Sequence, residues 1–222
     1  MTGDENSDAA PAEQRDNTPR YSVRDAAAEL PKHKRLLRSA RDGQILSALM
    51  LPAVLLSPPA GYGVITTTGR KTGKRRRKCI RVIRRGDRAY LVQLVPPHVA
   101  VTRPGAVSSW VWNIRANPHV RLRIKDGSFA GVAHEITDPA ELDAARSVLC
   151  ESVYPTDYAE AGLHLRGLPT RAKIKGLHRY WFDTGHPLVV ELRSSASRTS
   201  VRLRLSSQIG ANPRRADHTP PT

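Results

Sequence analysis

The chain has 222 residues, of which 39% are hydrophobic and 25% charged, a composition that can bury the core of one globular domain. Its formal net charge of +16 predicts anionic partners. The longest apolar run, Ile45 to Ser57, contains Pro52 and is shorter than the ~20 residues that cross a bilayer, which excludes a membrane-spanning helix there. Two lone cysteines, and an N-terminal segment without the apolar core of a signal peptide, favour a cytoplasmic protein.

Both ends of the chain are polar and contain proline. Residues 1–20 predict a disordered tail, and residues 194–222 predict a strand extension followed by a disordered basic tail. Residues 21–57 show apolar groups at helical spacing with basic residues between them, and Pro31 and Gly43 are expected to break this segment into pieces. The segment has two interpretations. It covers the core with its apolar face, or it lies as a peripheral anchor on the anionic inner face of the plasma membrane.

Residues 58–193 form one domain with the pattern of short strands. A β-branched run at 61–68 predicts a strand, and apolar residues that alternate with charged ones predict hairpins over 77–95 and 119–137. A last strand is expected at 187–193. Two helices are expected at 108–118 and 138–153. Mostly antiparallel strands with N-terminal and intervening helices indicate the α+β class and a barrel-like sheet.

A run of basic residues follows the first predicted strand. From Gly69 to Arg88 the chain has eleven Lys or Arg residues and a single acid, Asp87. At its start, T-T-T-G-R-K-T-G-K puts glycines, hydroxyls and cations in one turn, where backbone N–H groups can surround an anion. It is not a Walker loop, because the spacing differs and a strand follows. A solvated hairpin turn has the same composition, so both interpretations stay open.

The segment WVWNIRANP holds two of the chain's three tryptophans beside an amide side chain. On a helix, Trp110, Asn113 and Asn117 share one face. An indole and two amides on one face can border a flat ring and bond its edge. Core packing by the tryptophans, with the Asn-Pro pair ending the helix, is the alternative.

Together the two segments resemble a known family. The pair T-T-x-G-R-K-[T/S]-G and W-x-x-N-L-x-A-N-P is similar to the signatures of the actinobacterial deazaflavin-dependent nitroreductase and quinone reductase family. The matching residues are Thr67, Thr68, Gly69, Arg70, Lys71, Thr72, Gly73 and Lys74, then Trp110, Asn113, Ile114, Ala116, Asn117 and Pro118. The resemblance covers roughly residues 35 to 192 and is specific in these two motifs.

The resemblance implies a split β-barrel of the FMN-binding type that binds the 8-hydroxy-5-deazaflavin coenzyme, coenzyme F420. It implies an oxidoreductase that transfers hydride from the reduced coenzyme to a quinone or nitro-type acceptor. The implied coenzyme-binding residues are Thr67, Thr68, Gly69, Arg70, Lys71, Thr72, Gly73 and Arg76 around the phosphate tail, with Trp110, Asn113 and Asn117 near the ring. Tyr154 and Tyr158 lie in the region where the family places tyrosines, and a proton donor is needed there.

Two features depart from the family pattern. Arg75 stands where a proline usually follows the turn, and residues 94–109 replace a Gly-rich stretch with a bulkier, proline-containing loop, which predicts an altered or closed coenzyme pocket. A degenerate member that only binds coenzyme, and a nucleic-acid or polyanion binder without catalysis, are therefore alternatives. The basic run contains no aromatic residue on which bases could stack, which argues against the nucleic-acid binder. The histidines show no paired ligand spacing, so no metal site is predicted.

Overall fold

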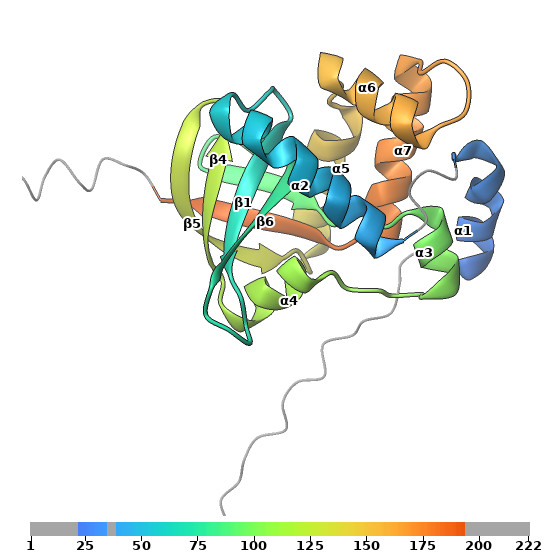
Figure 1. Ribbon diagram of the computed structural model, residues 1–222. Coiled ribbons are helices and arrows are strands. Elements are labelled where there is room, and N and C mark those ends of the chain that lie inside the picture. Colours follow the sequence, from blue (N-terminus) through green and yellow to red (C-terminus); the bar gives the residue numbers. More distant parts are fainter. Residues whose placement is uncertain (1–21, 35–38, 194–222) are drawn as a thin grey trace, which may run out of the picture.

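A closed, six-stranded antiparallel barrel forms the centre of the molecule (Figure 1). The computed structural model describes residues 22–34 and 39–193, so the predicted tails at 1–20 and 194–222 lie outside the described residues. The strands are β1 (Tyr62–Thr68), β2 (Arg75–Arg85), β3 (Arg88–Val92), β4 (His119–Ile124), β5 (Gly127–Glu135) and β6 (Pro187–Leu192). They follow one another around the barrel in the order β1-β2-β3-β6-β5-β4. The predicted α+β barrel and both predicted hairpins are confirmed.

Alternate residues of each strand fill the barrel, because side chains on a strand point to opposite faces. The inward set includes Ile80 and Val82 of β2, Leu122 of β4 and Val190 of β6, which pack in one core cluster. Residues of the opposite parity, such as Ile83, pack outside the barrel against helices. The even-numbered residues of β2 therefore point into the barrel, from Val82 and Ile80 back to the more polar residues at the beginning of the strand.

Eight helices surround the barrel in the described part of the chain. They are α1 (Val23–Glu29), the 3-10 helix η1 (Leu30–Lys32), α2 (Ala40–Leu56), α3 (Pro97–Thr102), α4 (Ser109–Ala116), α5 (Pro139–Glu151), α6 (Pro155–His164) and α7 (Arg171–Thr184). In Figure 1, α2 crosses the barrel in front of β1, α4 lies at one end, and α5, α6 and α7 gather on the other side. No described helix has both the length and the apolar character needed to cross a membrane.

Helix α2 corrects the expected break at Gly43. That glycine lies inside a 17-residue helix, which begins at a capping box formed by Ser39 and Asp42 and also contains Pro52. The cap satisfies free N–H groups at the helix start, and this outweighs the modest cost of one internal glycine. Little of the helix is buried: Leu49 is 77% exposed and Leu56 is 82% exposed.

The C-terminal helix α7 was not predicted from the sequence. Its buried residues Ile174, Leu177, His178 and Trp181 have the i, i+3, i+4 and i+7 spacing of a helix that packs on one face. Helix α4 has Ser108 at its N-cap position, although the Ser108 side chain makes no capping hydrogen bond.

Strand β2 is longer than its neighbour β3. Only residues 82–85 of β2 pair with β3, whereas residues 75–81 pair with β1 alone among the described strands. Part of the remaining edge is covered by α2, because the Cys79 amide donates a hydrogen bond to Ser47 Oγ at 3.0 Å. The unequal lengths therefore leave an opening beside β2, with α2 on one side.

Candidate functional site

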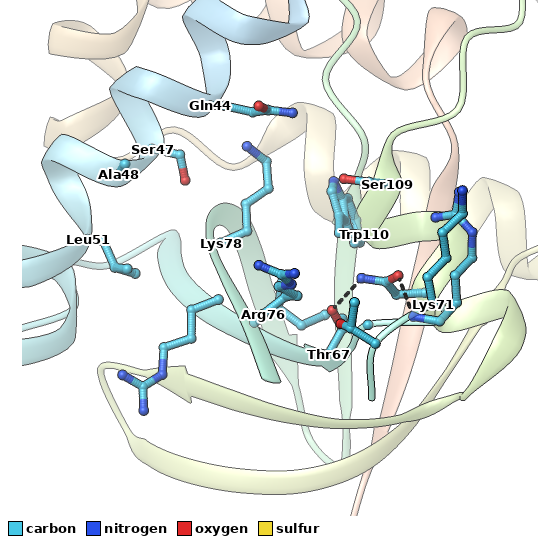
Figure 2. Close-up of a pocket in the computed structure, with 16 residues that line it drawn as sticks. Gln44, Ser47, Ala48, Leu51, Thr67, Lys71, Arg76, Lys78, Ser109 and Trp110 are labelled. Carbon is cyan, nitrogen blue, oxygen red and sulfur yellow. Dashed lines mark hydrogen bonds between the residues drawn. The ribbon is translucent and has the colours of Figure 1, made fainter. Parts of the chain in front are cut away.

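A pocket of about 500 Å³ lies at this opening, a volume typical of small-molecule sites. It is bounded by α2, the β1–β2 turn, the first part of β2 and the start of α4 (Figure 2). The lining residues are Gln44, Ser47, Ala48, Leu51, Ile65, Thr67, Gly69, Arg70, Lys71, Thr72, Arg76, Arg77, Lys78, Ser109, Trp110 and Asn113. The two motifs singled out in the sequence therefore meet across one pocket.

The glycine-rich turn between β1 and β2 has a defined backbone. Gly69 donates to the Lys74 carbonyl at 2.9 Å, and Gly73 donates to the Gly69 carbonyl at 2.8 Å. Gly73 has φ of +65°, which favours glycine, and a Cβ at Gly69 would lie 3.1 Å from the Lys74 carbonyl oxygen. The turn thus holds the cationic side chains that follow Gly69 at the mouth of the pocket.

Asn113 joins this turn to helix α4. Its Oδ1 accepts a hydrogen bond from the Arg70 amide at 3.1 Å, and its Nδ2 donates to Thr67 Oγ1 at 3.2 Å. Both bonds are drawn in Figure 2. Because the two polar atoms of this buried amide already have protein partners, Asn113 positions the turn as well as lining the pocket.

The loop that departs from the family pattern is held by one buried glutamine. Gln93 donates through Nε2 to the Ala106 carbonyl at 2.6 Å and accepts from the Ser108 amide at 2.8 Å. These bonds fix the residues immediately before α4, which places Trp110 in the pocket wall. The bulkier loop contains α3 and leaves a pocket at the start of α4, so of the two predicted outcomes, an altered or a closed pocket, closure is not seen.

The cations of the pocket have no carboxylate partner within salt-bridge distance among the described residues, and this holds for Arg70, Lys71, Arg76 and Lys78. The Arg70 guanidinium lies 5.9 Å from the centre of the Trp112 ring, on the outer side of α4. An uncompensated group of cations in a concavity attracts anions. The pocket is therefore suited to a phosphate-bearing ligand.

Several predicted site residues lie outside the lining. Thr68 and Gly73 belong to the strand end and the turn without lining the pocket, and Asn117 caps the end of α4, where its Oδ1 accepts from the His119 amide at 3.1 Å. The sequence in turn missed the contribution of α2, because the pattern gave no sign that residues 44–51 would lie against β2. Lys78 was detectable, since it shares the strand parity of Arg76.

Tyr154 and Tyr158 do not line the pocket. Tyr154 is the N-cap of α6, and its ring packs on Gly61, where a Cβ would lie 2.6 Å from the ring. That position precedes β1, whereas the glycine-rich turn follows it, and a strand of seven residues is about 20 Å long. Tyr158 is 40% exposed. Their role as proton donors stays a prediction.

A second polar cluster lies at the far end of β1, between the barrel and α6. The buried Arg81 guanidinium pairs with Asp157 at 2.7 Å and donates to the Ser152 carbonyl at 2.8 Å. Tyr62 contacts Asp157 at 3.2 Å and also contacts Glu160. Burial raises the pKa of the Glu160 carboxyl to about 8. This cluster joins the barrel to the C-terminal helices and does not line the pocket.

The remaining hypotheses concern charge and metals. Arg77 and Arg121 are the partners of Thr66 on the two neighbouring strands, and Arg77 also lines the pocket; binding of a polyanion there stays a hypothesis. Membrane attachment through α2 is likewise untested. No group of His, Cys, Asp or Glu in the described residues could hold a metal ion.

Comparison with known proteins gives one family match. The model of the family described as F420H(2)-dependent quinone reductase matches residues 58–163, which contain both motifs and most of the barrel. A search of curated proteins found no match. The pocket described above fits what this family binds, since the cationic turn suits a phosphate and the indole of Trp110 suits a flat ring.

Solved structures with a similar chain course are distant. One described as a domain-swapped dimer has 21% identity and a TM-score of 0.42 and covers 68% of this chain and 94% of that chain. An F420-H2 dependent reductase (FDR-A) has 19% identity and a TM-score of 0.38, covering 60% and 95%. A conserved hypothetical protein from Mycobacterium tuberculosis has 17% identity and a TM-score of 0.36, covering 61% and 74%.

The family uses reduced coenzyme F420 and consists of oxidoreductases, as the sequence motifs implied. The match over residues 58–163 includes the glycine-rich turn, helix α4 and five of the six barrel strands. Residues 58–163 of this chain are therefore similar to the F420H2-dependent quinone reductase family.

Proposed function

We propose that the protein transfers hydride from reduced coenzyme F420 to a quinone or nitro-type acceptor at the pocket between α2 and α4. One observation carries the proposal: a cationic, glycine-containing turn and a buried indole line the same cavity of about 500 Å³. The turn supplies charge-assisted hydrogen bonds for phosphate, and the indole supplies a flat apolar wall. Apolar Leu51 and Ile65 line the same space, which suits an apolar acceptor.

The chain's residues have separate tasks in this proposal. Arg70, Lys71, Thr72 and Arg76 hold the phosphate tail, and Trp110 borders the ring. When bound, the deazaflavin supplies the hydride, and the protein binds, orients and excludes water. Asn113 keeps the phosphate turn in place through its two hydrogen bonds.

The first experiment is a fluorescence titration of the full chain with oxidised coenzyme F420. We expect binding, and we expect Lys71→Ala to weaken it by about tenfold or more, because a charge-assisted hydrogen bond is lost. Lys125→Ala is the matched control, since Lys125 is exposed in the β4–β5 turn and away from the pocket. Absence of binding at high coenzyme concentration would contradict the proposed function.

The acceptor is tested by following oxidation of the reduced coenzyme with a quinone and with a nitroaromatic compound. Faster turnover with the quinone would identify the acceptor class that the apolar lining favours. Coenzyme binding without oxidation by either acceptor would instead support a member that binds coenzyme and does not catalyse. Tyr154→Phe and Tyr158→Phe belong in the same assay, because an unchanged rate would remove their assignment as proton donors.

A further inference from the structure

Lys78 is a cation of the pocket that lies apart from the phosphate turn. It follows Arg76 by two residues on β2, so both side chains leave the same face of the strand about 7 Å apart. In Figure 2 the Lys78 side chain extends between α2 and α4, away from Lys71 and toward Gln44. Its surroundings in the lining are Ser47 and Gln44 on one side and Trp110 on the other.

The surroundings of Lys78 are unfavourable for a free ammonium. Burial lowers the pKa of the Lys78 ammonium below its ordinary value. No carboxylate is within salt-bridge distance of it among the described residues, although such a partner would restore the charged form. Gln44 and Ser47 are polar but carry no charge. A partly buried cation without a countercharge costs stability, and an anionic ligand would offset that cost.

Arg81 is a cation on the same strand whose charge is compensated by a carboxylate. Three residues beyond Lys78, the Arg81 guanidinium is buried and has Asp157 at 2.7 Å. The protein therefore supplies a carboxylate where a cation of β2 is closed off from ligands and supplies none where the cation faces the cavity.

We propose that Lys78 is a second anion-binding group of the pocket and holds an ionised edge of the deazaflavin ring. The inference rests on the proposed function. The ring carries a hydroxyl on a conjugated system, so it can lose a proton and spread the negative charge over its edge. The ammonium stabilises that anion, while Arg70, Lys71, Thr72 and Arg76 hold the phosphate. The pocket then binds two separate negative charges of one ligand, the ring anion and the phosphate.

The test uses two ligands, oxidised coenzyme F420 and the phosphate-free 8-hydroxy-5-deazaflavin chromophore. Fluorescence titration gives the affinity for each, and an absorbance titration with pH gives the pKa of the bound ring hydroxyl. We expect Lys78→Met to weaken both ligands by about tenfold and to raise the ring hydroxyl's pKa, because one charged hydrogen bond is lost. Lys78→Arg should keep the low ring pKa, and Lys125→Met should change nothing.

Lys71→Ala supplies the complementary pattern. It should weaken the coenzyme and leave the affinity of the phosphate-free chromophore unchanged. If Lys78→Met weakens only the phosphate-bearing ligand, Lys78 belongs to the phosphate turn and the inference is wrong. It is also wrong if Lys78→Met leaves the ring hydroxyl's pKa in the bound coenzyme unchanged, in which case the proposed function stands. Failure of the wild-type chain to bind coenzyme would overturn both the inference about Lys78 and the proposed function.

A measurement without ligand separates a binding role from a structural one. Because the Lys78 ammonium has no countercharge, Lys78→Met should raise the thermal unfolding midpoint of the free protein, whereas Lys125→Met should not. A lower midpoint for Lys78→Met would show that the ammonium supports the fold, which contradicts the inference.

Discussion

Strand β2 carries cations in two regions that differ in how the charge is compensated. In its middle, Arg81 is buried with Asp157 and backbone carbonyls around its guanidinium. At its beginning, Arg76 and Lys78 line a pocket and have no carboxylate partner among the described residues. The two regions are parts of the same strand and belong to opposite faces of the barrel. The difference separates a cation that is paired within the fold, Arg81, from two cations that are available to a ligand, Arg76 and Lys78.

The difference can be stated in terms of energy. A buried pair contributes little net stability, but it becomes costly when one partner is removed. An unpaired cation at a pocket reduces stability slightly, and its removal costs ligand affinity instead. Substitutions in the two regions should therefore affect different measurements.

The largest effect is expected from Asp157→Asn. It leaves the Arg81 guanidinium buried without a countercharge, and we expect a loss of about 3–5 kcal/mol in the free energy of unfolding, measured with urea. Arg76→Met, in the pocket, is the contrasting variant and should leave that free energy unchanged or slightly higher. Equal losses from both variants would remove the distinction between the two regions.

An intermediate effect is expected at Asn113, where the pocket depends on a hydrogen-bonded amide rather than on charge. Asn113→Leu removes the bonds to the Arg70 amide and Thr67, and we expect coenzyme affinity to fall about tenfold. Asn113→Asp should reduce affinity further, because a carboxylate next to the phosphate turn repels the ligand. If the Asn113→Asp and Asn113→Leu variants bind coenzyme with equal affinity, the turn does not hold an anion.

The smallest effect concerns Glu160 and pH. Its pKa of about 8 in the folded protein lies above its ordinary value of 4.5. Between these values the folded state keeps a proton that the unfolded state has lost, so this group lowers stability as pH rises toward 8. Glu160→Gln should flatten the fall in unfolding free energy between pH 6.5 and 8. An unchanged slope would show that the carboxyl is ionised in the folded protein.

The strands of the barrel were predictable because their alternation is set by burial on one face. Val120, Leu122 and Ile124 were expected to share a face, and they do so inside the barrel. The pocket was predictable only in its two motifs. What α2 contributes depends on tertiary packing, since Gln44 and Ser47 lie in a helix that is mostly exposed and has no clear apolar face.

The buried pair of Arg81 and Asp157 could not be predicted for a different reason. In the sequence, Arg81 is one of many arginines in a basic run, and Asp157 lies 76 residues away. Only the path of the chain brings them together. The sequence pattern therefore does not distinguish Arg81 from Arg77, although Arg81 is buried with a carboxylate partner and Arg77 is exposed.

The unequal lengths of β2 and β3 have a consequence for association between chains. An unpaired strand edge is a template on which a second polypeptide can add a strand, and proteins prevent this with charged side chains and coverings. Here α2 covers the edge at Cys79, and Arg75, Arg76 and Arg77 are exposed along the part beyond it. Arg75 and Arg77, to which no phosphate contact is assigned, thus oppose pairing of this edge with another copy of itself through like-charge repulsion.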